Sequence, residues 1–260
     1  MRGPALAALL AGGIALLWNA LGFAQGTPPA GPGPGFGPPR EFNPPKIEPP
    51  KLEKLGDERY RIGTIVLDRK RRTFTAPGRV LHLDDAPLEY VAVARDGYKG
   101  YESVLELDST ASEFNLACIL IGLDGESATK PKFQFDNQPV DGPRVALELR
   151  WKLDGKPAER IAVHEALVEM GPDGSQRAVS DDWVYIASYL EPNSSRFGAD
   201  TMGTVIGFVH DPASVVEHRT GLGIGAYGSV QVRKDRLPPI GTPVELILSL
   251  PEAKASTVGR

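Results

Sequence analysis

The sequence predicts a mainly β, antiparallel fold of sandwich or barrel type, with one short buried helix and room for a second. Short runs of β-branched and aromatic residues alternate with turn residues along most of the chain, which is typical of strands and hairpins. One almost wholly apolar stretch, at residues 109–121, carries the start and stop signals of a helix instead. An α+β fold is the alternative, because residues 159–170 fit either a helix or a strand.

The first residues of the 260-residue chain have the pattern of a signal peptide. Residues 1–24 combine Arg2, an apolar run that ends at Trp18, and small side chains just before a predicted cleavage point after Ala24. The run is shorter than the roughly 20 apolar residues of a transmembrane helix. We therefore expect export to the periplasm or the cell exterior, with an uncleaved N-terminal membrane anchor as the alternative.

Residues 25–55 are rich in proline and glycine and are predicted to form a disordered, extended tether. Proline removes backbone donors, and the segment offers too little apolar area to offset the entropy of ordering it. A single β-rich domain is predicted to cover residues 56–251, and residues 252–260 are expected to fray.

The domain is expected to begin with strands around a basic turn. Residues 61–67 and 73–75 flank Arg69-Lys70-Arg71-Arg72, which we interpret as a solvated hairpin tip. A contact for anionic surfaces or polymers is the alternative for this basic run. Residues 79–83 follow the Pro77-Gly78 pair as a further strand.

The next two strands are predicted to form a hairpin closed by Asp96-Gly97, because a type I′ turn needs residues that tolerate positive φ. This register places Val91 opposite Glu102 and Tyr90 opposite Ser103. Glu102 then shares a face with valines, where a carboxylate is costly unless it is paired or protonated. Either that face is solvated, or Glu102 has a partner supplied from elsewhere in the chain.

The helix predicted at residues 109–121 is bounded by recognisable signals. Thr110 and Glu113 have the spacing of a capping box, and Gly122 supplies a C-terminal stop. The helix is apolar enough to belong to the core, and Cys118 is expected to act there as a packing residue. A single cysteine excludes an internal disulfide and a cluster ligated by several thiolates of this chain.

Four later runs are predicted as strands: residues 145–151, 183–186, 204–209 and 244–250. Residues 153–156 should form a hairpin turn and residues 171–174 a break between elements. The glycine-rich residues 221–228 superficially resemble a dinucleotide-binding fingerprint. Ala226 stands where its closing glycine is expected, so we interpret the segment as a flexible loop.

Composition and spacing argue against several classes of function. The net charge is −4 and acids and bases are interspersed, without the basic stripe of a nucleic-acid-binding protein. Metal-ligand spacing is absent among His82, His164, His210 and His218, which we interpret as surface or cap residues. We therefore expect no metal and no cofactor.

Two hydrolytic sites can be weighed from the sequence. The serines lack the G-x-S-x-G context of a nucleophile elbow, which disfavours a serine hydrolase. Glu102 with Asp181 or Asp182 is a candidate carboxylate pair of the glycosidase type.

Several fragments, in this order, resemble the YdjY-domain family of exported bacterial proteins, which has no established activity. The fragments are RIGTIVLDRKRRTFTAPGRVLHLDDAPLEYVAV, GYESVLEL, ACILIGL, VALELRW, DDWVYIAS, HDPASVVEH and LPPIGTPVELIL. Together they span roughly residues 56–250, essentially the whole predicted domain. The resemblance implies an exported, single-domain, β-rich protein and implies no chemistry.

The chain departs from this family pattern at two places. Tyr101-Glu102-Ser103 stands where a His-Glu-Ser type triplet is expected, and Ala187-Ser188 stands where Gly-Ser is expected. The missing histidine weakens a metal or acid–base role for the triplet. A ferredoxin-like label, which some relatives carry, does not fit a chain with one cysteine.

The function we expect is that of a non-enzymatic binding or structural module of the cell envelope. Its candidate binding residues lie on two predicted strands: Tyr101, Glu102, Ser103, Trp183 and Tyr185. An envelope or protein partner would bind through the surface near Glu102. The alternative is an acid–base enzyme or hydrolase in which Glu102 lies in a pocket, within hydrogen-bond reach of a distant histidine or aspartate.

Overall fold

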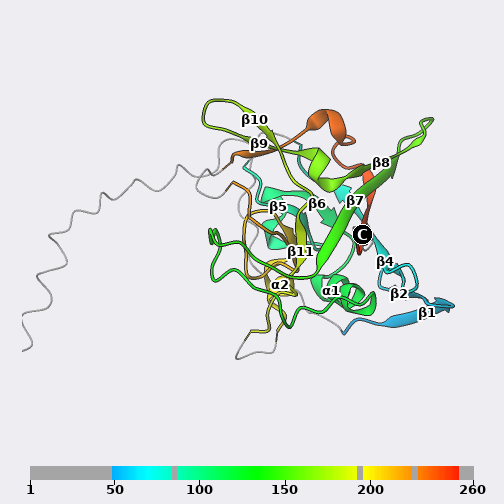
Figure 1. The fold of residues 1–260 in the computed structure, drawn as a ribbon. Helices are drawn as coiled ribbons and strands as arrows, with labels where there is room; N and C mark the ends of the chain where they lie inside the picture. The colour runs from blue at the N-terminus through cyan, green and yellow to red at the C-terminus, as the bar shows by residue number, and fades with distance from the viewer. Residues whose placement is uncertain (1–48, 84–86, 192–195, 224–227, 252–260) are drawn as a thin grey trace, which may run out of the picture. The chain divides into compact units, whose positions relative to one another are not determined.

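The strands close into an eight-stranded barrel in the computed structural model of the chain (Figure 1). The structure describes residues 49–83, 87–191, 196–223 and 228–251. The predicted signal peptide, most of the predicted tether and the tail at 252–260 lie outside these residues. None of the helices in the described part of the chain has the length and hydrophobicity of a membrane span. The mainly β prediction is confirmed, and of its two forms the barrel is the one observed.

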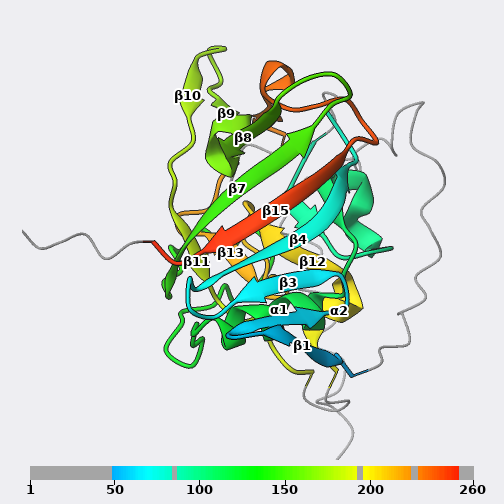
Figure 2. The ribbon, with the colours of Figure 1, turned by 90° about the vertical axis from the view of Figure 1, so that its right-hand side faces the viewer.

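Eight strands follow one another around the barrel: β4 (Thr73–Val80), β15 (Pro243–Ser249), β7 (Arg144–Lys152), β11 (Trp183–Tyr185), β13 (Val216–His218), β12 (Thr204–Gly207), β5 (Tyr90–Val93) and β6 (Ser103–Leu107). The ring closes because β6 also pairs with β4. Most neighbours are antiparallel, but β5–β6 and β12–β13 are parallel. Figure 2 shows β7, β15 and β4 side by side along one wall.

The remaining strands extend this ring or lie beside it. The extensions are β3 (Ile65–Asp68), β2 (Arg59–Ile62) and β1 (Leu52–Gly56) beyond β4, and β8 (Ala158–Ala162) beyond β7. A separate three-stranded sheet holds β10 (Gln176–Ala178), β9 (Leu167–Met170) and β14 (Val230–Val232), in that order.

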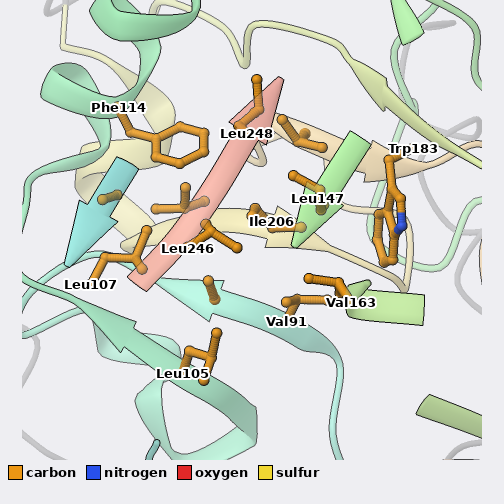
Figure 3. Close-up of a cluster of buried hydrophobic side chains, with 14 of the residues drawn as sticks. Val91, Leu105, Leu107, Phe114, Leu147, Val163, Trp183, Ile206, Leu246 and Leu248 are labelled. Atoms are coloured by element: carbon orange, nitrogen blue, oxygen red, sulfur yellow. The ribbon is translucent and has the colours of Figure 1, made fainter. Parts of the chain in front are cut away.

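The barrel is filled by aliphatic and aromatic side chains (Figure 3). Strand β7 alternates buried and more exposed positions along its length, as the sequence predicts for residues 145–151. Its Leu147 lies in one continuous core with Ile206, Leu246 and Leu248, all at most 1% exposed. Burial of each such side chain contributes about 1.5–3 kcal/mol, so this core is the main source of stability.

Strand β4 runs straight through Pro77 and Gly78, where the sequence suggests a break between two strands. On one edge it pairs with β15 from Thr73 to Arg79, and on the other it passes from β3 to β6. Pro77 stands just before this change of partner, where a missing N–H costs least. A Cβ atom at position 78 would lie 2.4 Å from the carbonyl oxygen of Glu106, so glycine allows β6 to approach.

The prediction that β5 and β6 form a hairpin is wrong. Tyr90 does pair with Ser103, as expected, but the two strands are parallel. A type I′ turn needs positive φ at both central residues; Asp96 has φ 56°, whereas Gly97 has φ −58°. The chain instead continues through a 3₁₀ segment, η1 (Tyr98–Glu102), which carries it back to start β6 beside the beginning of β5.

The predicted core helix is confirmed as α1 (Ala111–Leu120). Thr110 and Glu113 form the capping box, and Gly122 adopts φ 97° after the last turn. Cys118 is fully buried. The basic run is the β3–β4 turn, as predicted, but Arg72 reaches α1: its Nε donates to the carbonyl oxygen of residue 121 at 3.2 Å. One residue of the run therefore stabilises the helix C-terminus.

Other boundaries differ from the predictions for local reasons. Residues 61–67 are divided into β2 and β3 by a turn at Gly63, which has φ 54°. The ambiguous residues 159–170 form β8, a 3₁₀ turn η2 (Val163–Ala166) and β9. Strand β1 begins inside the predicted tether. The sequence did not indicate this strand, because its side chains are all exposed and show no hydrophobic alternation. Two further short elements are α2 (Gly198–Met202), the second helix, and η3 (Lys234–Arg236).

Candidate functional site

Four carboxylate side chains gather near the β5, β12 and β13 strands and are almost completely buried. Glu89 is 3% exposed, Glu102 4%, Asp211 7% and Glu217 0%. They come from the residue before β5, the end of η1, the loop after β12, and the middle of β13. We call these four residues the carboxylate cluster. Buried carboxylates are costly unless they are paired, hydrogen-bonded or protonated, so the contacts of each one matter.

The parallel pairing of β5 with β6 brings the first two members together. Because Tyr90 lies opposite Ser103, the preceding residues Glu89 and Glu102 are also neighbours, and the Glu89 N–H donates to the Glu102 carbonyl at 2.9 Å. The Glu89 carbonyl accepts N–H groups of Phe208 at 3.1 Å and Val209 at 3.2 Å, which fixes the start of the loop that carries Asp211.

Lys99 is the counter-ion of Glu102. Its Nζ lies 2.5 Å from Glu102 Oε1, and the two side chains are only 11% and 5% exposed. The ammonium group also lies 5.9 Å from the centre of the Tyr90 ring and 5.8 Å from that of Tyr101. Both distances allow cation–π attraction. The ion pair therefore links the second residue of η1 to its last residue, close to the Tyr101 ring.

Hydrogen bonds connect the remaining carboxylates in a chain. Gln134 Nε2 donates to Glu89 Oε2 at 2.7 Å, and the Tyr90 hydroxyl donates to Asp211 Oδ2 at 2.7 Å. The Asp211 backbone N–H then donates to Glu217 Oε1 at 3.1 Å. Residues separated by more than a hundred positions are thus held in one polar network beside the barrel.

Burial sets the protonation of this network. Burial and the neighbouring Glu102 carboxylate raise the pKa of Glu89 to about 7, although Lys99 acts in the opposite direction. Burial also raises the pKa of Glu102, against the effect of Lys99, and it raises the pKa of Glu217 well above its usual value. Burial and Asp211 raise the pKa of Tyr90, which keeps its proton for the bond to Asp211. These shifts favour the protonated forms of Glu89 and Glu217.

Gly207 provides the space for Glu217. A Cβ atom at position 207 would lie 2.5 Å from Glu217 Oε1 and 2.8 Å from Ser214 Oγ, both too close for a real contact. The Gly207 backbone is paired with residue 217 across the parallel β12–β13 junction. A glycine in the middle of this sheet is therefore a requirement of the buried carboxylate.

The five predicted site residues have different environments. Tyr101 is 45% exposed, whereas Glu102 and Ser103 are buried. Ser103 Oγ donates to the Lys99 carbonyl at 2.8 Å and so helps to fix η1. Trp183 is 0% and Tyr185 1% exposed; the Tyr185 hydroxyl donates to Asn115 Oδ1 at 2.7 Å.

Trp183 and Tyr185, two of the five candidate binding residues, are therefore buried and do not contribute to a surface near Glu102. Trp183 and Tyr185 face the barrel core, where the Trp183 ring meets His218 edge-on with ring centres 5.2 Å apart. The residue between them, Val184, belongs to a small separate apolar cluster. In the sheet, β13 and β12 stand between β11 and β5. Alternation along a strand does not reveal which face is the inside of a barrel.

Asp181 and Asp182, which the sequence suggested as carboxylate partners of Glu102, form ion pairs with other residues. Asp182 accepts from Arg219 Nε at 2.9 Å and also pairs with Arg144, and Asp181 lies 3.4 Å from His164 Nδ1. The carboxylate pairing suggested for Glu102 with these aspartates is replaced by its contacts with Lys99.

Two histidines expected at the surface are buried. His210 has its ring nitrogens 2.8 Å from the Asp136 carbonyl and 3.1 Å from the His218 carbonyl. Burial lowers the pKa of His218 to about 4. Among the residues that the structure describes, no group of three or more His, Cys, Asp or Glu side chains could hold a metal ion. Residues 224–227 of the glycine-rich loop lie outside the described residues.

Sequence reasoning found Glu102 but missed Glu89, Asp211 and Glu217. A signal was present for Glu217, which directly follows two valines in a strand-like run. No such signal marks Asp211, which stands in an Asp-Pro turn and is brought to Tyr90 only by the tertiary fold.

Comparison with known proteins yields one match. A family model described as the YdjY domain matches residues 65–249, from β3 to the end of β15. No curated protein and no solved structure matches the chain.

Proposed function

The chain belongs to the YdjY-domain family, and from this premise we propose that it is an exported, non-enzymatic binding or structural module of the cell envelope. The proposal is supported chiefly by one observation: Tyr101 is 45% exposed, while the Lys99–Glu102 ion pair next to its ring is almost completely buried. Export is supported by the signal-peptide pattern of residues 1–24.

The burial of the carboxylate cluster favours a structural role for its charges. A catalytic acid or base must come within hydrogen-bond distance of a reacting group. Glu89 and Glu102 are each below 5% exposed and are already bonded to Gln134 and Lys99. These contacts hold η1 in place, which leaves the outer side of η1 for a partner.

Tyr101 has the properties of an interface anchor. Its ring packs edge-on against Tyr98, with centres 6.2 Å apart, and the Lys99 ammonium lies at 5.8 Å. An aromatic side chain held in this way loses little conformational entropy on binding, and tyrosine is enriched among residues that dominate interface energy. We therefore place the partner on the η1 surface, defined as Tyr98, Lys99 and Tyr101.

Site-specific photo-crosslinking in the source cells tests this proposal. A photoreactive amino acid replaces Tyr101 in one variant and Ile119, which is 50% exposed on α1, in a control. We expect one discrete crosslinked product from position 101, found in the envelope fraction, and none from position 119. Retention of the protein in the cytoplasm, or the same products from both positions, would contradict the proposal.

An acid–base enzyme is the second candidate, because burial and Glu102 raise the pKa of Glu89 to about 7. A carboxyl group poised near neutral pH suits general acid–base catalysis. Chromogenic esters, phosphate esters and glycosides are tested with the wild type, Glu89→Gln, Glu102→Gln and the exposed control Glu53→Gln. Turnover that is lost in the first two variants and kept in the control would favour the enzyme over the binding module.

A further inference from the structure

A cleft of about 620 Å³ opens between η2, the β9–β10 hairpin and η3, and it shares no residue with the carboxylate cluster or the η1 surface. Its size falls within the roughly 300–1,000 Å³ of sites that bind small ligands. The residues that matter to its chemistry are Glu165, Leu167, Val168, Val179, Arg233 and Arg236.

One part of the cleft is apolar. Leu167 is 3%, Val168 9% and Val179 6% exposed, and all three are branched aliphatic side chains that line the cleft. Ala178, which also lines it, pairs with Val168 across the β9–β10 hairpin. A ligand with an aliphatic body would remove the exposed part of these groups from water.

The other part carries two guanidinium groups that are weakly engaged. Arg233 lies 3.5 Å from Asp235 Oδ2, and Arg236 lies 3.4 Å from Glu165 Oε2, both at the limit of a hydrogen bond. Arg236 Nε is buried and has no partner among the described residues. Glu165 also accepts the Ala162 N–H at 3.3 Å, so its carboxylate is shared. Both arginines therefore have donors to offer a ligand.

The net charge of the residues that line the cleft indicates the charge of the ligand that it can bind. Arg233, Arg236 and Glu165 together give the lining a formal charge of about +1, whereas the whole chain carries −4. A planar guanidinium binds a carboxylate through two parallel hydrogen bonds. A single carboxylate balances this charge, whereas a dianionic phosphate would exceed it.

We propose that this cleft binds a small carboxylate with an aliphatic body. The carboxylate lies between Arg233 and Arg236, and the aliphatic part packs on Leu167, Val168 and Val179. The site is separate from the η1 surface, so it adds a ligand to the proposed binding module and does not depend on the partner at Tyr101.

Calorimetric titration of the full chain with octanoate tests the site. The comparison compounds are octylammonium, which reverses the charge, octan-1-ol, which removes it, and acetate, which lacks the aliphatic body. We expect saturable binding of octanoate, at least tenfold weaker binding of octan-1-ol, and no detectable binding of the other two. Equal binding of octanoate and octan-1-ol would overturn the role of the arginines.

Variants locate the binding. Arg233→Gln and Arg236→Gln should each weaken octanoate binding about tenfold, because each removes a charge-assisted pair. Arg177→Gln is the matched control, since Arg177 lies on β10 and pairs with Glu169 but does not line the cleft. An equal loss in Arg177→Gln would overturn the site. If Arg236→Gln fails to fold, Arg233→Gln decides, because that side chain is 46% exposed.

A further titration separates two sources of the same chemistry. A short peptide that ends in a free leucine carboxylate presents the same groups as octanoate, and its C-terminal amide does not. Tighter binding of the free-acid peptide than of octanoate would overturn the assignment to a small ligand and favour the end of a polypeptide chain. Failure of every titration would leave the crosslinking result at Tyr101 unchanged, so the two proposals fail separately.

Discussion

Lys99 Nζ lies 2.5 Å from Glu102 Oε1, three residues further along the same short turn, and both side chains are nearly sealed from water. A buried ion pair contributes little net stability compared with apolar residues of the same shape, but removal of one partner leaves an uncompensated charge. The pair is therefore a sensitive point for testing how η1 is held.

We expect Lys99→Met to destabilise the protein by about 3 kcal/mol at pH 7, because Glu102 loses its counter-ion in a buried site. The double variant Lys99→Met/Glu102→Gln should recover most of this loss. Urea unfolding followed by circular dichroism measures both. The exposed lysine variant Lys156→Met is the control and should change stability by less than about 0.5 kcal/mol. A double variant no more stable than Lys99→Met would show that charge is not the cause.

The raised pKa of Glu89 gives the protein a stability that depends on pH. Burial and Glu102 raise this pKa from 4.5 to about 7, so between these values the folded state binds more protons than the unfolded state. Stability from Glu89 is then fully present below about pH 4.5 and is lost as the pH rises to 7, by about 3 kcal/mol at most.

Urea unfolding of wild type and Glu89→Gln between pH 4.5 and 8 measures this contribution as the difference between the two proteins. Glutamine keeps the shape but cannot ionise, so the wild type should lose stability relative to Glu89→Gln as the pH rises. The control Glu53→Gln, whose exposed side chain pairs with Arg61, should run parallel to the wild type. A difference that grows in the opposite direction would refute the assignment.

Local sequence signals were sufficient for some elements and insufficient for the site. The capping box of Thr110 and Glu113 acts within one turn, so α1 could be predicted from neighbouring residues alone. The barrel could be foreseen only as a class, since strand order depends on long-range pairing. Asp96 and Gly97 suited a hairpin turn, yet Gly97 packs close to Gly203 and adopts negative φ, which redirects the chain into η1.

The carboxylate cluster could not be predicted for the same reason. Glu102 could be singled out because a carboxylate among valines is unusual. Its neighbour Glu89 could not, because the two residues are brought together by the parallel pairing of β5 with β6, which the sequence does not indicate. Asp211 and Glu217 join through a backbone N–H and a tyrosine hydroxyl, which no spacing in the sequence encodes.

Gly207→Ala should destabilise the protein by about 1–3 kcal/mol, because the new methyl group would lie 2.5 Å from Glu217 Oε1. Thermal and urea unfolding measure the loss. Addition of Glu217→Ala to Gly207→Ala should cost less than the two single changes suggest, since the closest of the clashes at position 207, with Glu217, is then absent. Gly56→Ala is the control, because nothing lies within 4 Å of a Cβ atom there. Strictly additive losses would mean that Gly207 and Glu217 do not interact.

The basic run at the β3–β4 turn contains two arginines with different roles: Arg72 contacts the end of α1, whereas Arg71 is solvated. Arg72 donates to the carbonyl oxygens of Ile121 and Gly122, at 3.2 and 3.4 Å, and so supplies donors to the end of α1. Positive charge at a helix C-terminus is also favoured by the helix dipole. Arg71 has an 82% exposed side chain and lies 3.9 Å from Asp68.

Arg72→Met should therefore lower the free energy of unfolding by about 1 kcal/mol, whereas Arg71→Met should leave it within about 0.5 kcal/mol of the wild type. Both variants remove one positive charge from the same turn, so a difference between them reports the contact with α1 and not the charge of the run. Hydrogen exchange at residues 118–122 should accelerate only in Arg72→Met. Equal stability and equal hydrogen exchange in the two variants would show that Arg72 does not stabilise α1. The whole run would then be a solvated hairpin tip, as the sequence predicts.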